Sequence, residues 1–507
     1  MTILEKIKEN ARSIPGQIMM IHRSSDYEER LTWKELDDYS DYLAGWIDYN
    51  LHTKTPIIVY GHKSPMMIVC FLACVKSGRA YCPIDINVPH SRIEAIVDEV
   101  QPEIILATET LKIGSFDVLD INGINEVILC KKTRITRDKF VKEDDLFYII
   151  FTSGSTGVPK GVQITLGCLD NFIKWAIGLG KGAGSNCQRT FINQAPFSFD
   201  LSVMDLYMCL YFGGTLWALD KKTQSDMKLL IESLKDSKAN VWVSTPSFAD
   251  VCLSDPSFDE KALPFLDDFL FCGEILSNKT AQRLRSRFPH STIVNTYGPT
   301  ESTCAVTGIT VTDSEIESES PIPVGRPKHG TWIKILKDDV EQMDGEKGEI
   351  VIVGDSVSIG YWNNAEKNRS LFGKTVVDGR EYRYYKTGDE GYLRDGVLHY
   401  CGRIDLQVKL HGYRIELGDI ENNLCKIDGV EQAVVIPRYR NGKVSSLAAG
   451  IVISDETNNE TVNADYIKHE LKSHLPEYMI PKKIVFMRTL PRTGNGKIDR
   501  KAVEEVI

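Results

Sequence analysis

Residues 146–165 read Leu-Phe-Tyr-Ile-Ile-Phe-Thr-Ser-Gly-Ser-Thr-Gly-Val-Pro-Lys-Gly-Val-Gln-Ile-Thr. The apolar run Leu146–Phe151 precedes a polar, glycine-rich segment, and the shorter run Val162–Thr165 follows it. That order predicts a strand, a loop and a second strand. The glycines leave backbone N–H groups free to point into one concavity, while the hydroxyls and Lys160 add donors and a positive charge. We therefore expect the loop Thr152–Gly161 to hold a polyphosphate.

Two other interpretations of glycine-rich segments in this chain are weaker. An ordinary Gly/Ser connector would explain the loop composition, but the Pro-Lys-Gly ending and the buried strand before it favour phosphate binding. A Walker A loop requires a second glycine where this chain has Pro159. The segment Gly178–Ala183 matches a dinucleotide motif loosely, yet it follows a predicted helix, Leu169–Ile177, instead of a strand.

Composition is that of an ordinary globular enzyme. The chain has 507 residues, which is enough for about three domains. Its hydrophobic content is 42% and its charged content is 26%. The formal net charge of −10 argues against a nucleic acid as partner, because a polyanion would be repelled.

The cysteines and the lengths of the apolar runs indicate in which cellular compartment the protein resides. The 12 cysteines form no Cys-x-x-Cys pair and most stand singly in apolar segments, as do Cys130, Cys252 and Cys272. Buried, reduced thiols are expected, without a disulfide framework or a zinc site. No apolar run approaches the roughly 18 residues of a membrane span, and the N-terminus lacks the apolar core of a secretion signal. We expect a cytoplasmic protein with no membrane span.

Short apolar strands alternate with helical segments through the first two-thirds of the chain. One such helix is predicted at Met66–Lys76. The alternation predicts an α/β fold in which helices cover parallel sheets. The predicted strands are Pro56–Tyr60, Ile104–Ala107, Glu126–Cys130, Thr215–Leu219, Asn240–Ser244, Asp268–Cys272 and Thr292–Asn295.

The pattern changes after about Pro323. Strands joined by tight turns, in Gly348–Val353 and Gly391–Tyr400, indicate a small β subdomain. The last hundred residues predict a separate, mobile α+β domain. Its expected elements are the strands Ala433–Pro437, Leu447–Ile453 and Lys483–Met487 and the helix Ala464–Leu475. We expect a large N-terminal domain at 1–403 and a smaller C-terminal domain at 404–507.

Six motifs in a fixed order resemble those of the adenylate-forming (AMP-binding) superfamily. That family includes acyl-CoA synthetases, luciferase and the adenylation domains of peptide synthetases. The resemblance covers essentially the whole chain and implies an enzyme that uses ATP. The motifs are Thr152–Gly161, Asn295–Glu301, Tyr385–Asp389, Gly402–Asp405, Lys409–Glu416 and Asn495–Arg500.

Within this family the chain is most similar to ligases that activate D-alanine. The similarity implies that D-alanine and ATP form D-alanyl-AMP and pyrophosphate. The D-alanyl group then passes to the phosphopantetheine thiol of a separate carrier protein, for D-alanylation of teichoic and lipoteichoic acids. The segments that carry this similarity are Asn193–Tyr207, Gly213–Leu219, Ser244–Ala249 and Leu270–Glu274.

The resemblance assigns roles to residues of the nucleotide site. Lys497 would bridge the substrate carboxylate and the α-phosphate, and Arg403 would be the second catalytic cation. Asp389 and Arg403 would hold the ribose hydroxyls and the phosphate side, since two carboxylate oxygens suit a cis-diol. Tyr297 would stack on adenine. The implied ATP-binding residues are Thr152, Ser153, Gly154, Ser155, Thr156, Gly157, Lys160, Asn295, Thr296, Tyr297, Gly298, Pro299, Thr300, Asp389, Tyr400, Cys401, Gly402, Arg403 and Lys497.

The resemblance also assigns a metal ligand and a substrate pocket. Glu301 would bind Mg²⁺, because a carboxylate is a hard donor for a hard cation. Asp200 lies among apolar residues, where a carboxylate is costly without a cation, and the substrate α-ammonium would supply that cation. The alternative for Asp200 is a helix N-cap. Cys272 matches a pocket cysteine linked to the preference for D-alanine, and Cys304 stands where an aliphatic pocket residue is expected; Lys497 would complete the D-alanine site.

The second half-reaction involves the C-terminal domain. Asp405 would be the hinge on which this domain turns, and Gly412 would then face the pantetheine; an ordinary linker residue is the alternative for Asp405. Only seven residues follow Arg500, so we expect the carrier protein to act in trans. We expect a monomer.

Three competing functions remain open at this point. The chain could activate a different small amino acid for peptide natural products. It could be an acyl-CoA synthetase, although a fatty acid offers no ammonium for Asp200. It could also be a non-catalytic AMP-binding regulator, which would have lost Lys497, Asp389 or Glu301, and all three are present.

Overall fold

The computed structural model describes residues 1–24, 27–114, 116–154, 159–181, 188–440, 443–454, 462–492 and 498–507. These residues form two compact units. The first unit contains Met1–Ile86, Val100–Ile150 and Gly161–Gly402. The second contains Asn87–Glu99, Phe151–Lys160 and Arg403–Ile507.

A nine-stranded sheet forms one layer of the first unit, and its central strands are parallel. Antiparallel strands close it at both edges. In spatial order the strands are β15 (Arg326–Pro327), β14 (Thr307–Thr310), β13 (Thr292–Tyr297), β12 (Asp268–Phe271), β11 (Val241–Ser244), β9 (Thr190–Asn193), β10 (Thr215–Ala218), β1 (Ile18–Arg23) and β2 (Glu28–Thr32). The predicted parallel, helix-covered architecture is confirmed.

A second sheet of six strands carries the phosphate-loop stretch. Parallel pairing links β5, β3, β4 and β7, and the glycine-rich loop joins β7 to β8. β3 and β4 are buried along their whole length, as is typical of parallel strands covered on both faces. The order is β6 (Val118–Leu119), β5 (Ile105–Ala107), β3 (Ile57–Gly61), β4 (Tyr81–Asp85), β7 (Leu146–Thr152) and β8 (Lys160–Thr165).

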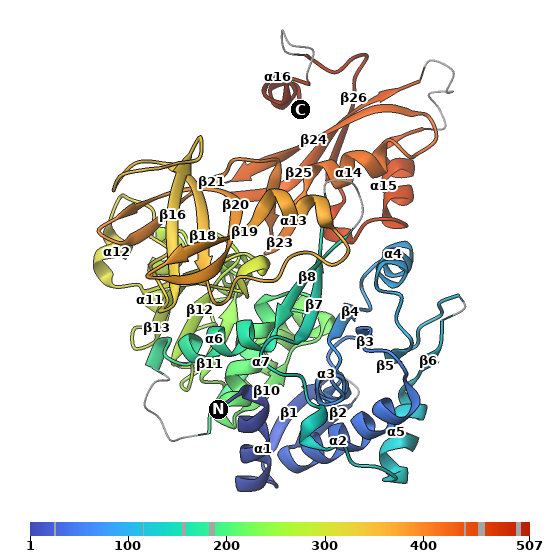
Figure 1. Ribbon diagram of the computed structural model, residues 1–507. Helices are drawn as coiled ribbons and strands as arrows, with labels where there is room; N and C mark the ends of the chain where they lie inside the picture. The colour runs from blue at the N-terminus through green and yellow to red at the C-terminus, as the bar shows by residue number, and fades with distance from the viewer. Residues whose placement is uncertain are drawn as a thin grey trace. The chain divides into compact units, whose positions relative to one another are not determined.

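Helices bury their apolar faces against both sheets. α7 is buried along almost its entire length and packs on the nine-stranded sheet (Figure 1). Residues of α3, α6 and α7 share one core cluster with the central strands of both sheets. The longer helices of the first unit are α1 (Ile3–Ser13), α2 (Trp33–Asn50), α3 (Pro65–Lys76), α5 (Ile121–Cys130), α6 (Leu166–Ala176), α7 (Leu201–Phe212), α9 (Met227–Ser237) and α11 (Asn278–Arg287).

An antiparallel sheet confirms the predicted β subdomain. Its hairpin between β20 and β21 turns at Asp395 and Gly396, both at positive φ, as the Asp-Gly sequence favours. The strands are β17 (Val340–Glu341), β16 (Thr331–Lys337), β18 (Gly348–Gly354), β20 (Arg380–Arg394), β19 (Phe372–Val377) and β21 (Val397–Arg403).

The second unit is a small α+β structure. Alternating residues of β24 and β25 face two cores, one shared with α14 and α15 and the other with α16. Its elements are α4 (His90–Val100), β22 (Gln407–Leu410), β23 (Tyr413–Glu416), α14 (Leu417–Leu424), β24 (Val430–Arg440), β25 (Lys443–Ile453), α15 (Ala464–Lys472), β26 (Lys483–Phe486) and α16 (Arg500–Val506).

Two predictions about individual elements are wrong. The expected strand Glu126–Cys130 lies inside the helix α5, which Asp120 caps and whose Ile124 and Ile128 are buried at helical spacing. Cys130 is consequently exposed at the helix end, not buried in a strand. The helix α15 ends three residues earlier than predicted, at Lys472, because Pro476 follows closely and disfavours helical backbone before it.

Candidate active site

In the first unit, three residues assigned to the nucleotide lie together. Tyr297, at the end of β13, donates a hydrogen bond from its hydroxyl to Asp389 Oδ2 at 2.6 Å. The Tyr297 ring lies 5.7 Å, centroid to centroid, from the ring of Tyr400. Burial and then the Asp389 carboxylate raise the pKa of Tyr297 well above its usual value, so its hydroxyl stays a donor. The carboxylate predicted to bind ribose is thus hydrogen-bonded directly to the tyrosine predicted to stack on adenine.

Asn295 presents a buried polar atom that is available to a ligand. Its Nδ2 donates to the carbonyl of Pro323 at 2.9 Å. Its Oδ1 is buried and has no hydrogen-bond partner among the described residues. A buried unsatisfied acceptor is costly, and an exocyclic amino group such as that of adenine would satisfy it.

Glu301 is fully buried in the short helix Thr300–Ser302 that follows β13. Its Oε1 accepts a hydrogen bond from the Tyr361 hydroxyl at 2.5 Å, which fixes the carboxylate. The described part of the chain holds no group of three side chains able to enclose a metal ion. A single carboxylate still fits Mg²⁺, because this ion usually takes its other ligands from water and substrate phosphates.

Asp200 stands at the N-cap position of α7 but does not act as a cap. Its backbone is helical, with φ −63° and ψ −20°, and its side chain makes no capping hydrogen bond. A capping residue normally has extended backbone and accepts from the first turn. The residue is 9% exposed. The capping alternative raised by the sequence is therefore not what this geometry supports.

Cys272 and Cys304 form a buried pair next to Asp200. Cys272 follows β12, and its Sγ donates to the Cys304 carbonyl at 3.6 Å. A hydrogen bond from Cys272, followed by burial and the charge of Asp200, raises the pKa of the Cys304 thiol well above its usual value. Cys304 has φ +68°, which is uncommon for a non-glycine residue. The structure thus brings all three described residues of the expected D-alanine pocket together.

Tyr148 belongs to this neighbourhood and was missed from sequence. It lies in β7, is fully buried, and its hydroxyl has no hydrogen-bond partner among the described residues. Burial raises the pKa of Tyr148 well above its usual value, with smaller contributions from Tyr81, Cys304 and Asp200. The only sequence signal was a hydroxyl inside the apolar run Leu146–Phe151.

In the second unit, the described residues of the phosphate loop contact the β22–β23 hairpin. Ser153 Oγ donates to the Arg414 carbonyl at 2.8 Å and accepts from the Glu416 backbone N–H at 3.3 Å. Lys160 forms a buried ion pair with the Glu416 carboxylate. Thr152 ends β7 and Gly154 follows it, whereas Ser155, Thr156 and Gly157 lie outside the described residues. The loop lysine therefore has a carboxylate partner within the protein.

Arg403 is also paired within the second unit. It contacts both carboxylate oxygens of Asp405, the residue expected to be the hinge, at 2.9 and 2.5 Å. Its Nη2 also donates to Gln407 Oε1 at 2.7 Å. Gln407 Nε2 in turn donates to Glu416 Oε1 at 2.8 Å. The Gln407 amide therefore contacts Arg403 directly and is connected to Lys160 through Glu416. Gln407 lies between two of the sequence motifs and carried no sequence signal of its own.

The remaining predicted residues occupy turns and strand ends. Gly412, at φ +83°, forms a two-residue hairpin turn with His411, a backbone conformation that glycine favours. Cys401 and Gly402 lie at the end of β21, and Gly298 and Pro299 link β13 to Thr300. Lys497 lies outside the described residues.

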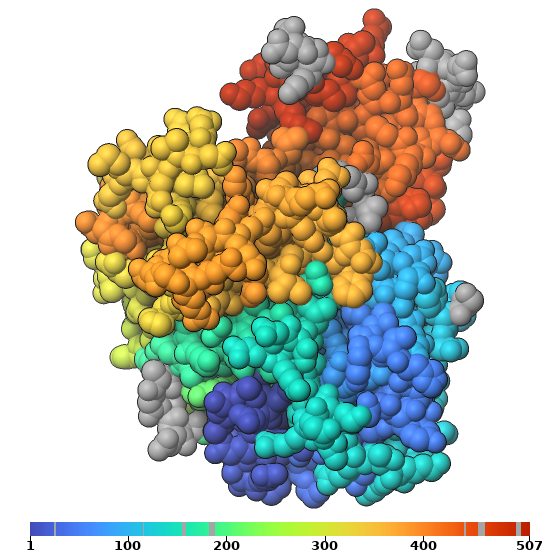
Figure 2. Space-filling model, viewed as in Figure 1, coloured from blue at the N-terminus to red at the C-terminus, as the bar shows by residue number. Residues whose placement is uncertain are grey.

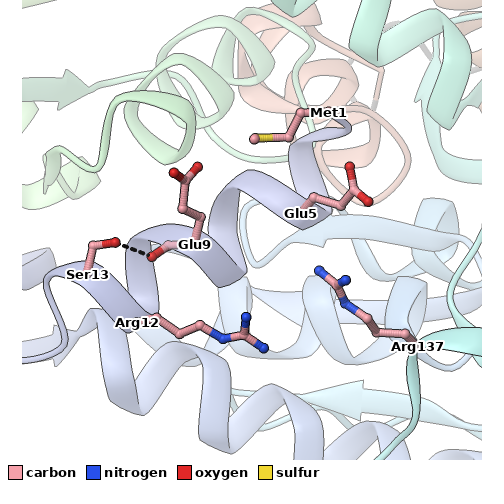
Figure 3. A pocket seen from close by; sticks show the side chains of 6 residues that line it. All are labelled: Met1, Glu5, Glu9, Arg12, Ser13 and Arg137. Carbon is pink, nitrogen blue, oxygen red and sulfur yellow. Dashed lines mark hydrogen bonds between the residues drawn. The ribbon is translucent and has the colours of Figure 1, made fainter.

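A surface cavity elsewhere contains none of these residues. About 520 Å³ in volume, it is lined by residues of α1 and by Arg137 (Figure 3). Ser13 donates to the Glu9 carbonyl there, and in this view the side chains of Glu5 and Glu9 lie above those of Arg12 and Arg137. The N-terminal residues, dark blue in Figure 2, form part of the outer surface of the first unit.

Two family models match most of the chain. The model of the AMP-binding enzymes matches residues 7–362, and the model of their C-terminal domain matches residues 419–497. A protein of Bacillus cytotoxicus (strain DSM 22905 / CIP 110041 / 391-98 / NVH 391-98), named D-alanine--D-alanyl carrier protein ligase, is 46% identical over 507 residues, covering 99% of this chain and 98% of the relative. A protein of the same name from Bacillus cereus (strain B4264) is 44% identical with equal coverage.

Solved structures show the same fold. Holo-PA1221, an NRPS protein containing adenylation and PCP domains, superposes with a TM-score of 0.84 at 27% identity, covering 100% of this chain and 84% of that chain. The Vibrio cholerae adenylation domain AlmE, solved with glycyl-adenosine-5'-phosphate, has a TM-score of 0.83 at 21% identity, covering 99% and 97%. Within the described residues, no helix is both long and apolar enough to cross a membrane.

Proposed function

The chain belongs to the family of AMP-binding enzymes, and we propose that it activates D-alanine with ATP and transfers it to a carrier protein. The first half-reaction joins the D-alanine carboxylate to the α-phosphate of ATP and releases pyrophosphate. The second passes the D-alanyl group from AMP to the phosphopantetheine thiol of a carrier protein in trans. The product serves D-alanylation of teichoic and lipoteichoic acids.

One observation carries the choice of an amino acid as substrate. Asp200 is buried at the start of α7 without a capping hydrogen bond, beside the paired Cys272 and Cys304. A buried carboxylate is stabilised by a cation, and the α-ammonium of the substrate is that cation. The two thiols leave room for a small side chain, and Cys272 supplies the bulk that favours the D enantiomer. A fatty acid has no ammonium group to interact with this carboxylate.

The nucleotide occupies the residues around Asn295, Tyr297 and Asp389. Asn295 Oδ1 accepts from the adenine amino group, Tyr297 and Tyr400 face the base, and Asp389 holds the ribose hydroxyls. Thr152 to Gly157 and Lys160 cradle the phosphates through N–H groups, hydroxyls and one charge. The remaining nucleotide contacts are Thr296, Gly298, Pro299, Thr300, Cys401 and Gly402.

Charge develops on the phosphoryl oxygens during the first half-reaction, and fixed cations stabilise it. Lys497 bridges the D-alanine carboxylate and the α-phosphate, and Arg403 supports the phosphate side. Glu301 holds Mg²⁺, which when bound neutralises part of the phosphate charge. Glu301 is held in place for this role by the Tyr361 hydroxyl.

The second half-reaction uses the smaller domain, 404–507, against the large domain, 1–403. Asp405 is the hinge residue, and Gly412 faces the pantetheine once the domain has turned. Arg403 leaves the Asp405 carboxylate when it engages phosphate. The enzyme acts in the cytoplasm as a monomer, with no nucleic-acid partner.

ATP–pyrophosphate exchange tests the proposal. The purified chain is assayed with Mg²⁺ and, separately, D-alanine, L-alanine, glycine, D-serine and a short fatty acid. Exchange that depends on D-alanine, with a higher kcat/KM than for the other amino acids, supports the proposal. Preference for another amino acid would indicate a different adenylation enzyme, and exchange with the fatty acid alone would remove the role of Asp200.

A further inference from the structure

Lys63 is a fully buried cation that neither half-reaction uses. It lies between β3 and α3, and its Nζ donates to Asn193 Oδ1 and to the Ala195 carbonyl, each at 2.5 Å. The ammonium also lies 4.9 Å from the centroid of the Phe197 ring. Lys63 thus contacts three of the first five residues of the segment that runs from β9 to Asp200.

Asp205 makes a second contact with this segment, through Asn193. Asn193 Nδ2 donates to Asp205 Oδ1 at 2.8 Å, and both side chains are fully buried. Asn193 is the last residue of β9 and Asp205 lies early in α7, so Asp200 stands between them in the chain. One asparagine amide therefore links the cation to a carboxylate and ties together the two ends of the loop that carries Asp200.

Burying the charges of Lys63 and Asp205 costs free energy, and the Asn193 amide lies between them. Burial lowers the pKa of Lys63 to about 8, against the attraction of Asp205. Burial likewise raises the pKa of Asp205, against the attraction of Lys63 and the hydrogen bond from Asn193. Well-packed apolar side chains would often be at least as stable as such buried charges. The cluster is thus better explained by the geometry that it imposes than by its contribution to stability.

We propose that Lys63, Asn193 and Asp205, the anchor cluster, are positioning residues that hold the segment Asn193–Asp200 and so place the Asp200 carboxylate for the substrate ammonium. The inference rests on the proposed role of Asp200. Lys63 follows a strand of the six-stranded sheet, whereas Asn193 ends a strand of the nine-stranded sheet, so the cluster fastens the segment to both. A small displacement of Asp200 would weaken amino-acid binding and leave the nucleotide contacts intact.

The chain provides a matched control in Lys76. This lysine is 1% exposed and lies on α3, but it pairs directly with Asp37 and Asp41, each at 2.7 Å, and among the described residues its polar partners lie on α2, outside the Asn193–Asp200 segment. Replacing either lysine by methionine removes one buried charge. Only Lys63→Met should disturb the amino-acid site.

The test measures KM for D-alanine and for ATP by pyrophosphate exchange. Lys63→Met should raise KM for D-alanine about tenfold, the effect of a modest displacement of one charged contact, with KM for ATP changed less than about twofold. Lys76→Met should lower the melting temperature and leave both KM values near those of the wild type. Equal increases in both KM values for Lys63→Met, or no increase, would overturn the inference.

Two further variants keep the test decisive if Lys63→Met fails to fold. Asp205→Asn has the same shape, and KM for D-alanine should rise about threefold because Lys63 loses the carboxylate that attracts it most strongly. An unchanged KM would contradict the cluster. The double variant Lys63→Met/Asp205→Asn should be no worse than Lys63→Met; effects that multiply would mean independent residues. If the wild type shows no D-alanine-dependent exchange, the proposed function fails, which is a separate result.

Discussion

The amino-acid pocket of the first unit and the phosphate cations of the second unit differ in whether their polar groups already have protein partners. In the first unit, the Tyr148 hydroxyl near the amino-acid pocket and Asn295 Oδ1 near the expected adenine site are buried without hydrogen-bond partners among the described residues. In the second unit, Lys160 is paired with Glu416 and Arg403 with Asp405. Under the proposed function, the pocket and the base site meet their ligands with these groups already in place, whereas the two cations exchange a carboxylate for a phosphate.

This difference has a physical reason. The pocket residues lie on strands and helices with buried cores on several sides, so their side chains keep one arrangement. Lys160 begins β8 and Arg403 ends β21, and at such strand ends ion pairs with carboxylates can be exchanged for charge-assisted contacts to phosphate. A site that serves two half-reactions needs some groups that change partner. The following variants test this division, from the largest expected effect to the smallest.

Lys497→Ala should abolish activation. Loss of a positioned charge at the phosphoryl group should slow D-alanine-dependent pyrophosphate exchange by about 1,000-fold. Transfer from preformed D-alanyl-AMP to the carrier should be largely retained. The exposed Lys501 of α16 supplies the control variant Lys501→Ala. Near-normal exchange by Lys497→Ala would show that the activating charge comes from elsewhere.

Asp200→Asn should impair amino-acid binding selectively. Removal of the carboxylate that faces the ammonium should raise KM for D-alanine by about 100-fold, equivalent to ~3 kcal/mol, with KM for ATP little changed. Asp226 is a useful control, because it does cap its helix, accepting from Lys228 and Leu229. Asp226→Asn should lower stability without affecting either KM. If Asp200→Asn behaved in the same way, Asp200 would be structural.

Asp405→Pro should separate the two half-reactions. Proline restricts φ at the hinge, so thioester formation should fall about tenfold more than adenylation. Proline also removes the carboxylate that binds Arg403 and accepts from the Gln407 N–H, and Asp405→Ala controls for that loss without restricting φ. Equal losses in both half-reactions for Asp405→Pro would indicate misfolding. No loss in either would exclude Asp405 as a hinge.

Cys272→Ala should weaken stereochemical preference. The buried thiol packs against Cys304, and removing its sulfur enlarges a pocket that discriminates by steric exclusion. The ratio of kcat/KM for D-alanine over L-alanine should fall by about tenfold, within the range of one methylene-sized change. Cys252→Ala, at another buried cysteine away from the pocket, is the control. A constant ratio in Cys272→Ala would assign discrimination to other residues.

Glu416→Gln should have the smallest effect, and its sign is informative. Removing the carboxylate that holds Lys160 should free this lysine for phosphate and lower KM for ATP about threefold, equivalent to ~0.6 kcal/mol. Glu421→Gln, which breaks a pair with Arg500 in the same unit, should leave KM for ATP unchanged. A higher KM for ATP in Glu416→Gln would mean that the ion pair supports nucleotide binding.

The sequence predicted the architecture well where strands are wholly apolar. Runs such as those of β3 and β7 are short, rich in branched and aromatic residues and bounded by turns, which distinguishes them from helices. The same reasoning gave the wrong element at Glu126–Cys130, because four consecutive apolar residues fit the period of a strand and that of a helix equally well. Only the buried pair Ile124 and Ile128, set by tertiary packing, resolves it as a helix.

Sequence motifs singled out individual candidate residues but not the contacts that they make in the folded chain. Motifs identified Tyr297 and Asp389 separately, but the hydrogen bond between them joins residues 92 positions apart. The contacts of Lys160 with Glu416 and of Lys63 with Asn193 are likewise set by folding across the chain. Helix and strand periodicity describes only residues that are close in sequence, so it carries no information on contacts between residues far apart in the chain.

Loading of the carrier protein tests the central claim most directly. The chain is incubated with ATP, Mg²⁺, a phosphopantetheinylated D-alanyl carrier protein and either D-alanine or L-alanine, and the intact carrier is weighed by mass spectrometry. The account predicts that D-alanine adds one alanyl group to the holo carrier and none to the apo carrier, with much slower loading of L-alanine. Pyrophosphate release without any gain in carrier mass, or equal loading of both enantiomers, would contradict it.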